Sequence, residues 1–202
     1  METKNTNPND DFSDLEDLST YEVTPVKKPE DSTTIFKELF EYLKLLAIAI
    51  AVALIINNFV IVNAQVPTGS MNSTILEGDR IIGFRLSYLF SKPERGDIII
   101  FRYPDDESQN FVKRVIGLPG DTVVIENGIV YVNGEILEEP YLNEPMYGSF
   151  GPYFVPEGCY FVLGDNRNDS RDSRYWVNTY VTSEQILAKA IFKYYKNFAM
   201  LK

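Results

Sequence analysis

Residues 123–132 read Val-Val-Ile-Glu-Asn-Gly-Ile-Val-Tyr-Val, and this stretch predicts a β-hairpin. Two short runs of β-branched and apolar residues flank Asn127-Gly128, a pair that readily adopts the positive φ angles of a two-residue turn. A hairpin needs further strands to bury its apolar face, so we expect β structure in the surrounding chain as well.

Similar short apolar runs occur on both sides of the hairpin, and turn-forming residues separate them. The predicted strands are 80–86, 97–102, 111–116, 159–163 and 190–195. One short helix is expected at 183–189, with Thr182 or Ser183 as its N-cap. Many short strands predict a mainly β fold, with antiparallel sheets that fold over one another or form a partial barrel.

The chain contains one long apolar run, from Leu43 to Ala64. A run of roughly 20 residues matches the thickness of a bilayer core, although Asn57 and Asn58 interrupt it. A buried helix is disfavoured because the apolar residues run all round, with no polar face. A cleaved signal peptide is the other alternative, since Val62-Asn63-Ala64 resembles a cleavage site. About forty mostly polar residues precede the run, which favours an uncleaved anchor.

The anchor divides the chain into three parts. Residues 1–34 form an acidic tail, residues 35–63 the transmembrane anchor, and residues 64–202 a single β domain. The first 33 residues carry nine acidic and three basic side chains and few apolar ones. Such a segment cannot bury enough apolar surface to offset its ordering entropy, so we expect a disordered tail.

The distribution of basic residues predicts the orientation of the anchor. No lysine or arginine follows the apolar run until Arg80, whereas four lysines precede it, namely Lys27, Lys28, Lys37 and Lys44. By the positive-inside rule the N-terminus lies in the cytoplasm, and the β domain lies outside the cytoplasm at the cell membrane.

Composition excludes several classes of function. The 202-residue chain has a net charge of −10 and no basic stripe, so nucleic acid is not an expected partner. Cys159 is the only cysteine and there is no histidine, which removes intrachain disulfides, histidine-dependent catalysis and most transition-metal sites. We therefore expect no metal and no cofactor. Cys159 itself suits a buried small hydrophobe better than a reactive thiol.

A serine directly after the apolar run is the first candidate for chemistry. Ser70 lies in Pro67-Thr68-Gly69-Ser70-Met71, and without histidine it needs another base. The candidate base is Lys113, which strand alternation places on one face with Phe111 and Val115. Apolar surroundings lower the pKa of a lysine, and a neutral lysine can accept a proton. The alternatives are an ordinary loop at Ser70 and a lysine that extends from a strand edge to water.

Residues 164–174 form a third polar cluster, Gly-Asp-Asn-Arg-Asn-Asp-Ser-Arg-Asp-Ser-Arg. A calcium loop is disfavoured because the glycine and terminal glutamate of an EF-hand are missing and three arginines intrude. A loop that satisfies its own polar groups fits better, since Asp172 can pair with Arg171 or Arg174. A plain solvated turn is the alternative.

Together, and in this order after a membrane anchor, these segments resemble the type I signal peptidases of bacteria in their compact, single-anchor form. The signature stretches are 67–71 with 78–79, 95–97 through 113–121, and 164–167 with 170 and 172–174. The resemblance covers most of residues 64–202. It implies a membrane-bound serine endopeptidase that removes N-terminal signal peptides from secreted preproteins after small residues, in the pattern Ala-X-Ala.

The resemblance also implies residue roles. Ser70 corresponds to the nucleophile and Lys113 to the general base. Ser170 would orient the lysine, while Asp172 and Arg174 would brace their loop.

By the same resemblance, the Thr68 hydroxyl and the Ser70 backbone N–H form the oxyanion hole. The positions that match the family's shallow apolar substrate clefts are Val66, Met71, Ile75, Ile81, Ile100 and Val112. An extended substrate is expected to pair beside the strand at 111–116 and the chain before Ser70. Expected partners are therefore signal peptides and membrane lipid, the latter through an aromatic patch at Tyr88-Leu89-Phe90, unless that patch packs in the core.

The chain departs from the family pattern at two places, the order Asn168-Asp169 and the stretch 177–180. Two other readings compete with the peptidase. A self-cleaving repressor-type Ser/Lys protease would carry a DNA-binding domain where this chain has a tail and an anchor. An inactive, membrane-tethered binding or scaffold protein on the same fold would have lost its nucleophile or base, and both residue types are present.

Overall fold

The computed structural model describes residues 32–195 and 198–201. The predicted disorder of the acidic tail concerns residues that lie outside this part of the chain, apart from residues 32–34. These three residues begin a helix, α1 (Ser32–Ile55), which continues as a π-helical turn, η2 (Ile56–Val60).

The apolar helix is long enough to cross a membrane. Residues Phe36–Val60 number 25, and an 18-residue window within them has a mean hydropathy of 2.4, so by length and composition they qualify as a span. Asn57 and Asn58 fall in the π-helical turn at its C-terminal end. The next strand, β1, begins at Ile61, so residues 61–63, assigned to the anchor from the sequence, are in an extended strand rather than in the helix.

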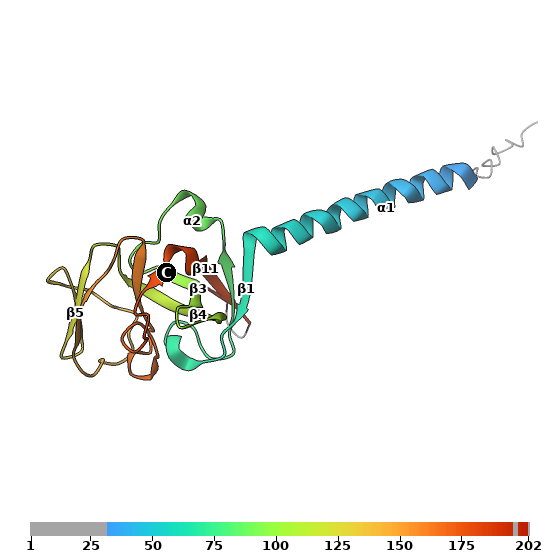
Figure 1. The fold of residues 1–202 in the computed structure, drawn as a ribbon. Coiled ribbons are helices and arrows are strands. Elements are labelled where there is room, and N and C mark those ends of the chain that lie inside the picture. Colours follow the sequence, from blue (N-terminus) through green and yellow to red (C-terminus); the bar gives the residue numbers. More distant parts are fainter. Residues whose placement is uncertain (1–31, 196–197, 202) are drawn as a thin grey trace, which may run out of the picture. The chain divides into compact units, whose positions relative to one another are not determined.

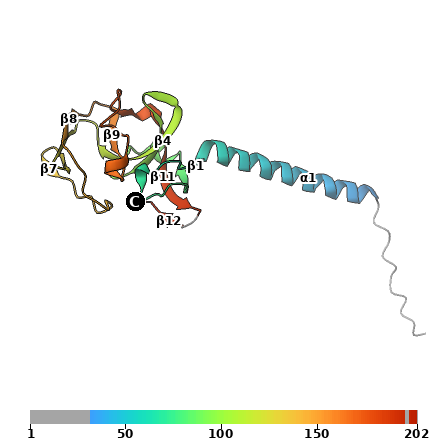
Figure 2. The ribbon, with the colours of Figure 1, turned by 90° about the horizontal axis from the view of Figure 1, so that it is seen from below.

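Two antiparallel sheets make up the β domain, and they lie beside one another in Figures 1 and 2. The large sheet has the order β1-β2-β11-β3-β4-β9-β10, with β12 paired to β11. Its strands are β1 (Ile61–Gln65), β2 (Arg80–Phe84), β3 (Ile98–Tyr103), β4 (Asp106–Gly117), β9 (Cys159–Leu163), β10 (Val181–Thr182), β11 (Ile186–Tyr194) and β12 (Ala199–Met200). Its path ends at β1 and β10, so among the described residues it is no closed barrel.

The small sheet has the order β7-β6-β5-β8 and contains the hairpin predicted at residues 123–132. Its strands are β5 (Thr122–Glu126), β6 (Ile129–Val132), β7 (Glu135–Ile136) and β8 (Phe150–Phe154). Asn127 and Gly128 have φ angles of 50° and 82°, as the two-residue turn requires. The predicted mainly β fold of antiparallel sheets is confirmed.

The predicted helix at 183–189 is wrong beyond its first turn. A 3-10 turn spans Ser183–Gln185, where the Thr182 N–H donates to the Gln185 side chain at 2.9 Å. The chain then enters β11, in which Ala188 pairs with Ile100 of β3. Ala188 is fully buried against Gly83, so strand pairing and burial override the local helix preference.

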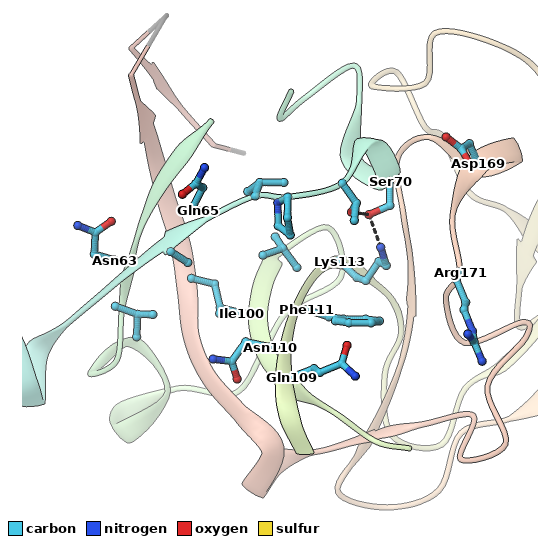
Figure 3. Close-up of a pocket in the computed structure, with 16 residues that line it drawn as sticks. Asn63, Gln65, Ser70, Ile100, Gln109, Asn110, Phe111, Lys113, Asp169 and Arg171 are labelled. Atoms are coloured by element: carbon cyan, nitrogen blue, oxygen red, sulfur yellow. Dashed lines mark hydrogen bonds between the residues drawn. The ribbon is translucent and has the colours of Figure 1, made fainter. Parts of the chain in front are cut away.

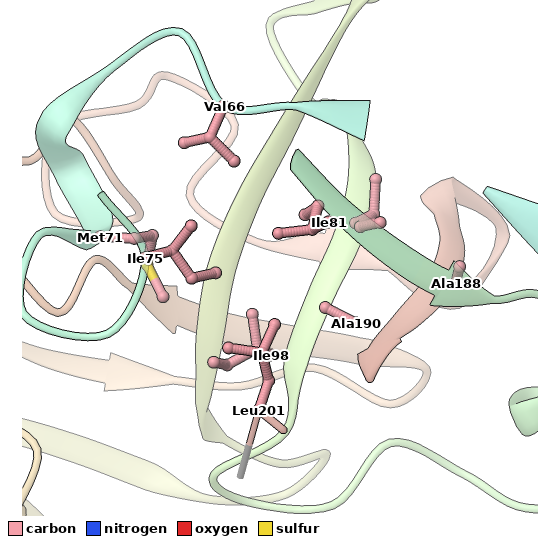
Figure 4. Packing of buried hydrophobic residues seen from close by; sticks show 9 residues of the cluster. Val66, Met71, Ile75, Ile81, Ile98, Ala188, Ala190 and Leu201 are labelled. Carbon is pink, nitrogen blue, oxygen red and sulfur yellow. The ribbon is translucent and has the colours of Figure 1, made fainter. Parts of the chain in front are cut away.

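Buried apolar side chains under β1 and the Ser70 segment form one packed cluster (Figure 4). Its members are Val66, Met71, Ile75, Ile81, Ile98, Ile100, Ala188, Ala190 and Leu201. A second cluster joins β9 to the small sheet, and Cys159 packs at its edge, where burial raises the pKa of the thiol. This environment agrees with a small apolar role for Cys159.

Two glycines at positive φ give a matched test of how tightly the 123–132 hairpin packs against the chain at Met146. Gly128 and Gly134 have φ angles of 82° and 85°, but only a Cβ on Gly128 would overlap a backbone atom, the carbonyl of Met146. We expect Gly128→Ala to lower the free energy of unfolding by about 1–3 kcal/mol more than Gly134→Ala. Urea unfolding followed by the fluorescence of the single tryptophan, Trp176, measures the difference. If both variants lose the same free energy of unfolding, the chain at Met146 moves away from the new Cβ at little cost.

Candidate active site

Ser70 and Lys113 come from different elements and meet at one point. Ser70 lies in a 3-10 turn (η3, Gly69–Met71) just after β1, and Lys113 lies in β4, paired with Ile99 of β3. The distance between Lys113 Nζ and Ser70 Oγ is 2.5 Å, a direct hydrogen bond (Figure 3). The Thr68 hydroxyl oxygen lies 3.3 Å from Ser70 Oγ. Among the described residues, these two side chains are the hydrogen-bonding neighbours of Ser70 Oγ.

Lys113 is buried, with only 3% of its surface exposed. Desolvation disfavours the ammonium form and lowers the pKa of Lys113 from 10.5 to about 8, against the opposing effect of the Asp172 and Asp165 charges. The ring of Phe111, on the same face of β4, lies 5.8 Å from Nζ. A substantial fraction of this lysine is therefore neutral slightly above neutral pH.

The loop after β9 holds the Ser70 turn in place. The Asn166 N–H donates to the Ser70 carbonyl at 3.1 Å, and its side-chain amide donates to the Gly69 carbonyl at 2.9 Å. The Thr74 hydroxyl donates to the Asp165 carboxylate at 2.5 Å. The turn is thus anchored on both sides of its serine.

A buried ion pair lies beneath the dyad. Arg114 donates twice to Asp165, from Nε at 2.9 Å and from Nη2 at 2.7 Å, and Nη1 donates to the Gly96 carbonyl at 2.8 Å. Because strand side chains alternate, Arg114 points away from the face of Lys113. Both residues lie in signature stretches, but neither was given a role from the sequence. A second charged residue beside Lys113 in the otherwise apolar stretch 111–116 was the available signal.

The loop residues that the resemblance singled out lie in two different environments. Asp172 pairs with Arg174 rather than Arg171, through contacts of 2.7 and 2.9 Å, and accepts a hydrogen bond from the Gly164 N–H at 3.0 Å. Ser170 is buried, and its hydroxyl makes no hydrogen bond within the described part of the chain. It packs beside Gly164, where a Cβ would overlap both Ser170 Oγ and the Ser70 carbonyl oxygen.

A groove of about 770 Å³ leads to the dyad (Figure 3). One wall is the chain from β1 to Ser70, and the other is residues 109–113 of β4; Asp169 and Arg171 also line the groove. In the described structure β1 pairs only with β2, and β4 pairs with β9 only from Arg114 onward. Both walls therefore offer unpaired backbone groups to the groove.

The six predicted pocket residues divide into two layers. Val66, Ile100 and Val112 line the groove. Met71, Ile75 and Ile81 are fully buried beneath them in the same apolar cluster, because the chain after Ser70 turns into the core. Lining residues that the sequence reading did not single out are Val62, Asn63, Ala64, Gln65, Gln109, Asn110, Asp169 and Arg171. Gln109 and Asn110 lie before the predicted strand at 111–116, because the observed strand β4 begins earlier, at Asp106.

The predicted aromatic patch is only partly exposed. Leu89 and Phe90, at the end of the short helix α2 (Ser87–Phe90), are 68% and 92% exposed. Tyr88 instead packs against the core, and its hydroxyl donates to Asp97 at 2.9 Å. Burial and the Asp97 charge raise the pKa of Tyr88.

Comparison with known proteins gives consistent matches. A family model described as "Signal peptidase, peptidase S26" matches residues 39–195. Signal peptidase I of Leptolyngbya laminosa is 37% identical over 192 residues, which are 91% of this chain and 93% of that protein. Probable signal peptidase I-1 of Synechocystis is 40% identical over 162 residues, 77% of this chain and 82% of that protein.

Signal peptidase I of Bacillus licheniformis is 41% identical over 155 residues, 72% of this chain and 83% of that protein. A crystal structure of a signal peptidase I from Enterococcus faecalis is 39% identical and covers 49% of this chain and 97% of that one, with a TM-score of 0.44. The family match extends over most of the chain, and each of the three relatives is covered for more than two thirds of its length. The chain therefore belongs to the signal peptidase family, peptidase S26.

Proposed function

We propose that this chain removes signal peptides from secreted preproteins with Ser70 as nucleophile and Lys113 as general base. Signal-peptide removal follows from the family to which the chain belongs. The observation that supports the residue assignment is the direct 2.5 Å contact between Lys113 Nζ and Ser70 Oγ in a chain without histidine. An inactive scaffold on the same fold is not supported.

In the proposed mechanism, neutral Lys113 takes the Ser70 proton as Oγ attacks the carbonyl carbon of the scissile bond. The resulting oxyanion accepts hydrogen bonds from the Ser70 N–H and the Thr68 hydroxyl. When the C–N bond breaks, the Lys113 ammonium gives its proton to the departing amine, and Ser70 is left as an ester. Neutral Lys113 then deprotonates a water, whose oxygen attacks the ester, and Ser70 recovers its proton.

The ion pairs around the dyad support a neutral lysine. The carboxylates of Asp165 and Asp172 both act to raise the pKa of Lys113 and so to keep it charged. Each of them is paired with an arginine, Arg114 or Arg174, at contacts of 2.7 to 2.9 Å. Pairing compensates most of the negative charge, so desolvation remains the dominant influence on Lys113.

The groove suits an extended peptide. A substrate strand between β1 and residues 109–113 of β4 would hydrogen-bond to both unpaired edges, as in β-augmentation. Its side chains next to the cut would face Val66, Ile100 and Val112. The fully buried layer below these residues leaves little depth, which supports a preference for small residues in the Ala-X-Ala pattern.

We further propose that the enzyme is anchored by one membrane span, with the N-terminus in the cytoplasm and the β domain, from Ile61 onward, outside. The lysines that precede the apolar run support this orientation, since no basic residue follows it before Arg80. A signal peptide is itself inserted in the membrane. Tethering would therefore confine enzyme and cut site to one thin layer and raise their effective concentration.

The residue assignment is tested with the full-length protein in lipid and a model preprotein that ends its signal peptide in Ala-X-Ala. We expect Ser70→Ala and Lys113→Ala to abolish cleavage, because one removes the nucleophile and the other its base. Thr68→Val should lower kcat by about 100- to 1,000-fold, the usual cost of losing one oxyanion donor, while Thr68→Ser should retain activity. Full turnover by Lys113→Ala would exclude it as the base.

The pH dependence follows from the lowered pKa of Lys113. Only the neutral amine accepts a proton, so kcat/KM should rise about tenfold per pH unit below pH 8 and level off above it. An unperturbed lysine would instead give a rise that continues to about pH 10. A rate–pH profile of the wild-type enzyme distinguishes the two, and a midpoint near 10 would contradict a buried, neutral base.

Contact with lipid is proposed for Leu89 and Phe90, whose exposed apolar side chains suit a membrane interface. Full-length protein carrying Phe90→Trp, reconstituted with brominated lipids, should lose tryptophan fluorescence. The matched control is Phe154→Trp, because Phe154 is 68% exposed and lies on the small sheet. Trp176 contributes the same background to both variants, so equal quenching would argue against a specific contact at α2.

A further inference from the structure

One loop of the small sheet reaches the residues that support the dyad. The chain from 137 to 149 connects β7 to β8, and Tyr141 within it covers the guanidinium of Arg114, with 3.8 Å between Cζ and the ring centroid. The backbone carbonyl of Tyr141 accepts a hydrogen bond from the Ser73 hydroxyl at 2.9 Å. Ser73 follows the Ser70 turn at a φ of 102°, which is rare for a residue with a side chain, so this contact holds an unfavourable conformation.

Glu139, in the same loop, joins Tyr141 to the loop after β9. Its carboxylate accepts two hydrogen bonds from Arg167, at 2.8 and 2.5 Å, and one from the Tyr141 hydroxyl at 2.7 Å. Arg167 is buried, and its Nε donates to the Gly164 carbonyl at 3.0 Å. Glu139 thus contacts, through Arg167, the segment whose Asn166 holds the Ser70 turn.

We propose that Tyr141 and Glu139 are positioning residues for the Ser70–Lys113 dyad, acting through Arg114 and the 164–170 loop. The inference rests on the proposed roles of Ser70 and Lys113. Neither Tyr141 nor Glu139 lines the substrate groove or contacts the reacting atoms. Their contribution is therefore to the chemical step rather than to substrate binding.

The Tyr141 ring acts on Arg114 in a way that a polar residue could not. A guanidinium stacked on an aromatic face keeps a favourable contact while water is excluded from it. Without the ring, water would reach the Arg114–Asp165 pair, and Arg114 would compensate the Asp165 charge less completely. The weaker compensation favours the charged form of Lys113, because the attraction of the Asp165 carboxylate grows.

The other charges that face Lys113 are Asp172 and Arg174, which pair with each other. Within the described residues, the polar partners of the Asp172 side chain are Gly164 and Arg174, outside the 137–149 loop, although Met146 near the end of that loop lies 3.3 Å from Arg174 Nη1. Loss of the ring should therefore act on the lysine mainly through Arg114 and Asp165. The expected signature is a change in the pH dependence of the reaction.

The experiment compares Tyr141→Leu, Tyr141→Phe and Glu139→Gln in the full-length enzyme in lipid, with kcat, KM and rate–pH profiles measured for each. Tyr141→Leu should lower kcat about tenfold at pH 7 and leave KM unchanged, and most of the rate should return at pH 10. A tenfold loss corresponds to a midpoint that moves up by about one pH unit. Tyr141→Phe keeps the ring and should lose less, and Glu139→Gln should lower kcat without raising KM, because Arg167 then holds the segment of Asn166 less firmly.

Tyr147→Leu is the matched control, because Tyr147 lies in the same loop but is 73% exposed. Its pH profile should match that of the wild type. A loss in Tyr141→Leu that is equal at every pH would overturn the proposal, since a reduced folded fraction would produce it. An increase in KM alone would also overturn it, because the loop would then act on substrate binding.

Tyr141→Phe and Glu139→Gln keep the test valid if Tyr141→Leu does not fold. If neither of them moves the midpoint or lowers kcat, positioning by this loop is excluded. The roles of Ser70 and Lys113 and the positioning roles of Tyr141 and Glu139 can be refuted independently. Activity that survives in Ser70→Ala or Lys113→Ala would refute the dyad itself, whereas an unmoved profile in the loop variants would refute only its positioning.

Discussion

The amine of Lys113 is buried among apolar side chains and, within the described residues, has no direct carboxylate partner. Its closest polar contact is the Ser70 hydroxyl at 2.5 Å. Burial of a charge without a partner is costly, and the molecule reduces this cost by lowering the pKa of the lysine to about 8. The same desolvation that opposes the charged form makes the neutral amine available as a base, which is the property that the proposed reaction needs.

Acidic residues near such a lysine could undo this effect, and the fold places two of them close by. Asp165 and Asp172 are each held by two hydrogen bonds from one arginine and are almost fully buried. Removal of either arginine would leave a buried carboxylate next to the dyad, at a typical cost of about 3–5 kcal/mol. We therefore regard the pairs Arg114–Asp165 and Arg174–Asp172 as part of the electrostatic environment of the site as well as of its stability.

The two sheets contribute differently to this arrangement. The large sheet supplies Lys113 from β4, the turn after β1 and the unpaired edges of the groove. The small sheet lies away from the groove, but its 137–149 loop reaches Arg114, Ser73 and Arg167. Under the proposed mechanism, a sheet that does not line the substrate groove would thereby affect the reaction, because its loop contacts residues that hold the Ser70 turn.

The sequence alone determined the features that depend on local chemistry. The period-2 alternation of β4, the Asn127-Gly128 turn and the apolar run were all readable, since each reflects only nearby residues. The end of the run was placed at Ala64, whereas a strand already begins at Ile61. Pattern reading also selected Ser70 and Lys113, because a chain without histidine leaves few candidate bases. It failed at 183–189, where the local helix preference was overridden by pairing of Ala188 with β3.

Only the tertiary structure decided which residues share a site. Arg114 and Asp165 are 51 positions apart, and nothing local to either one indicates its partner. The division of the six pocket candidates into a lining layer and a buried layer depends on how the chain after Ser70 turns into the core. Glu139 and Tyr141 were not singled out from the sequence, and their contacts with Arg167 and Arg114 arise from long-range packing. Partners of buried charges are set by such long-range packing, which a local sequence pattern does not contain.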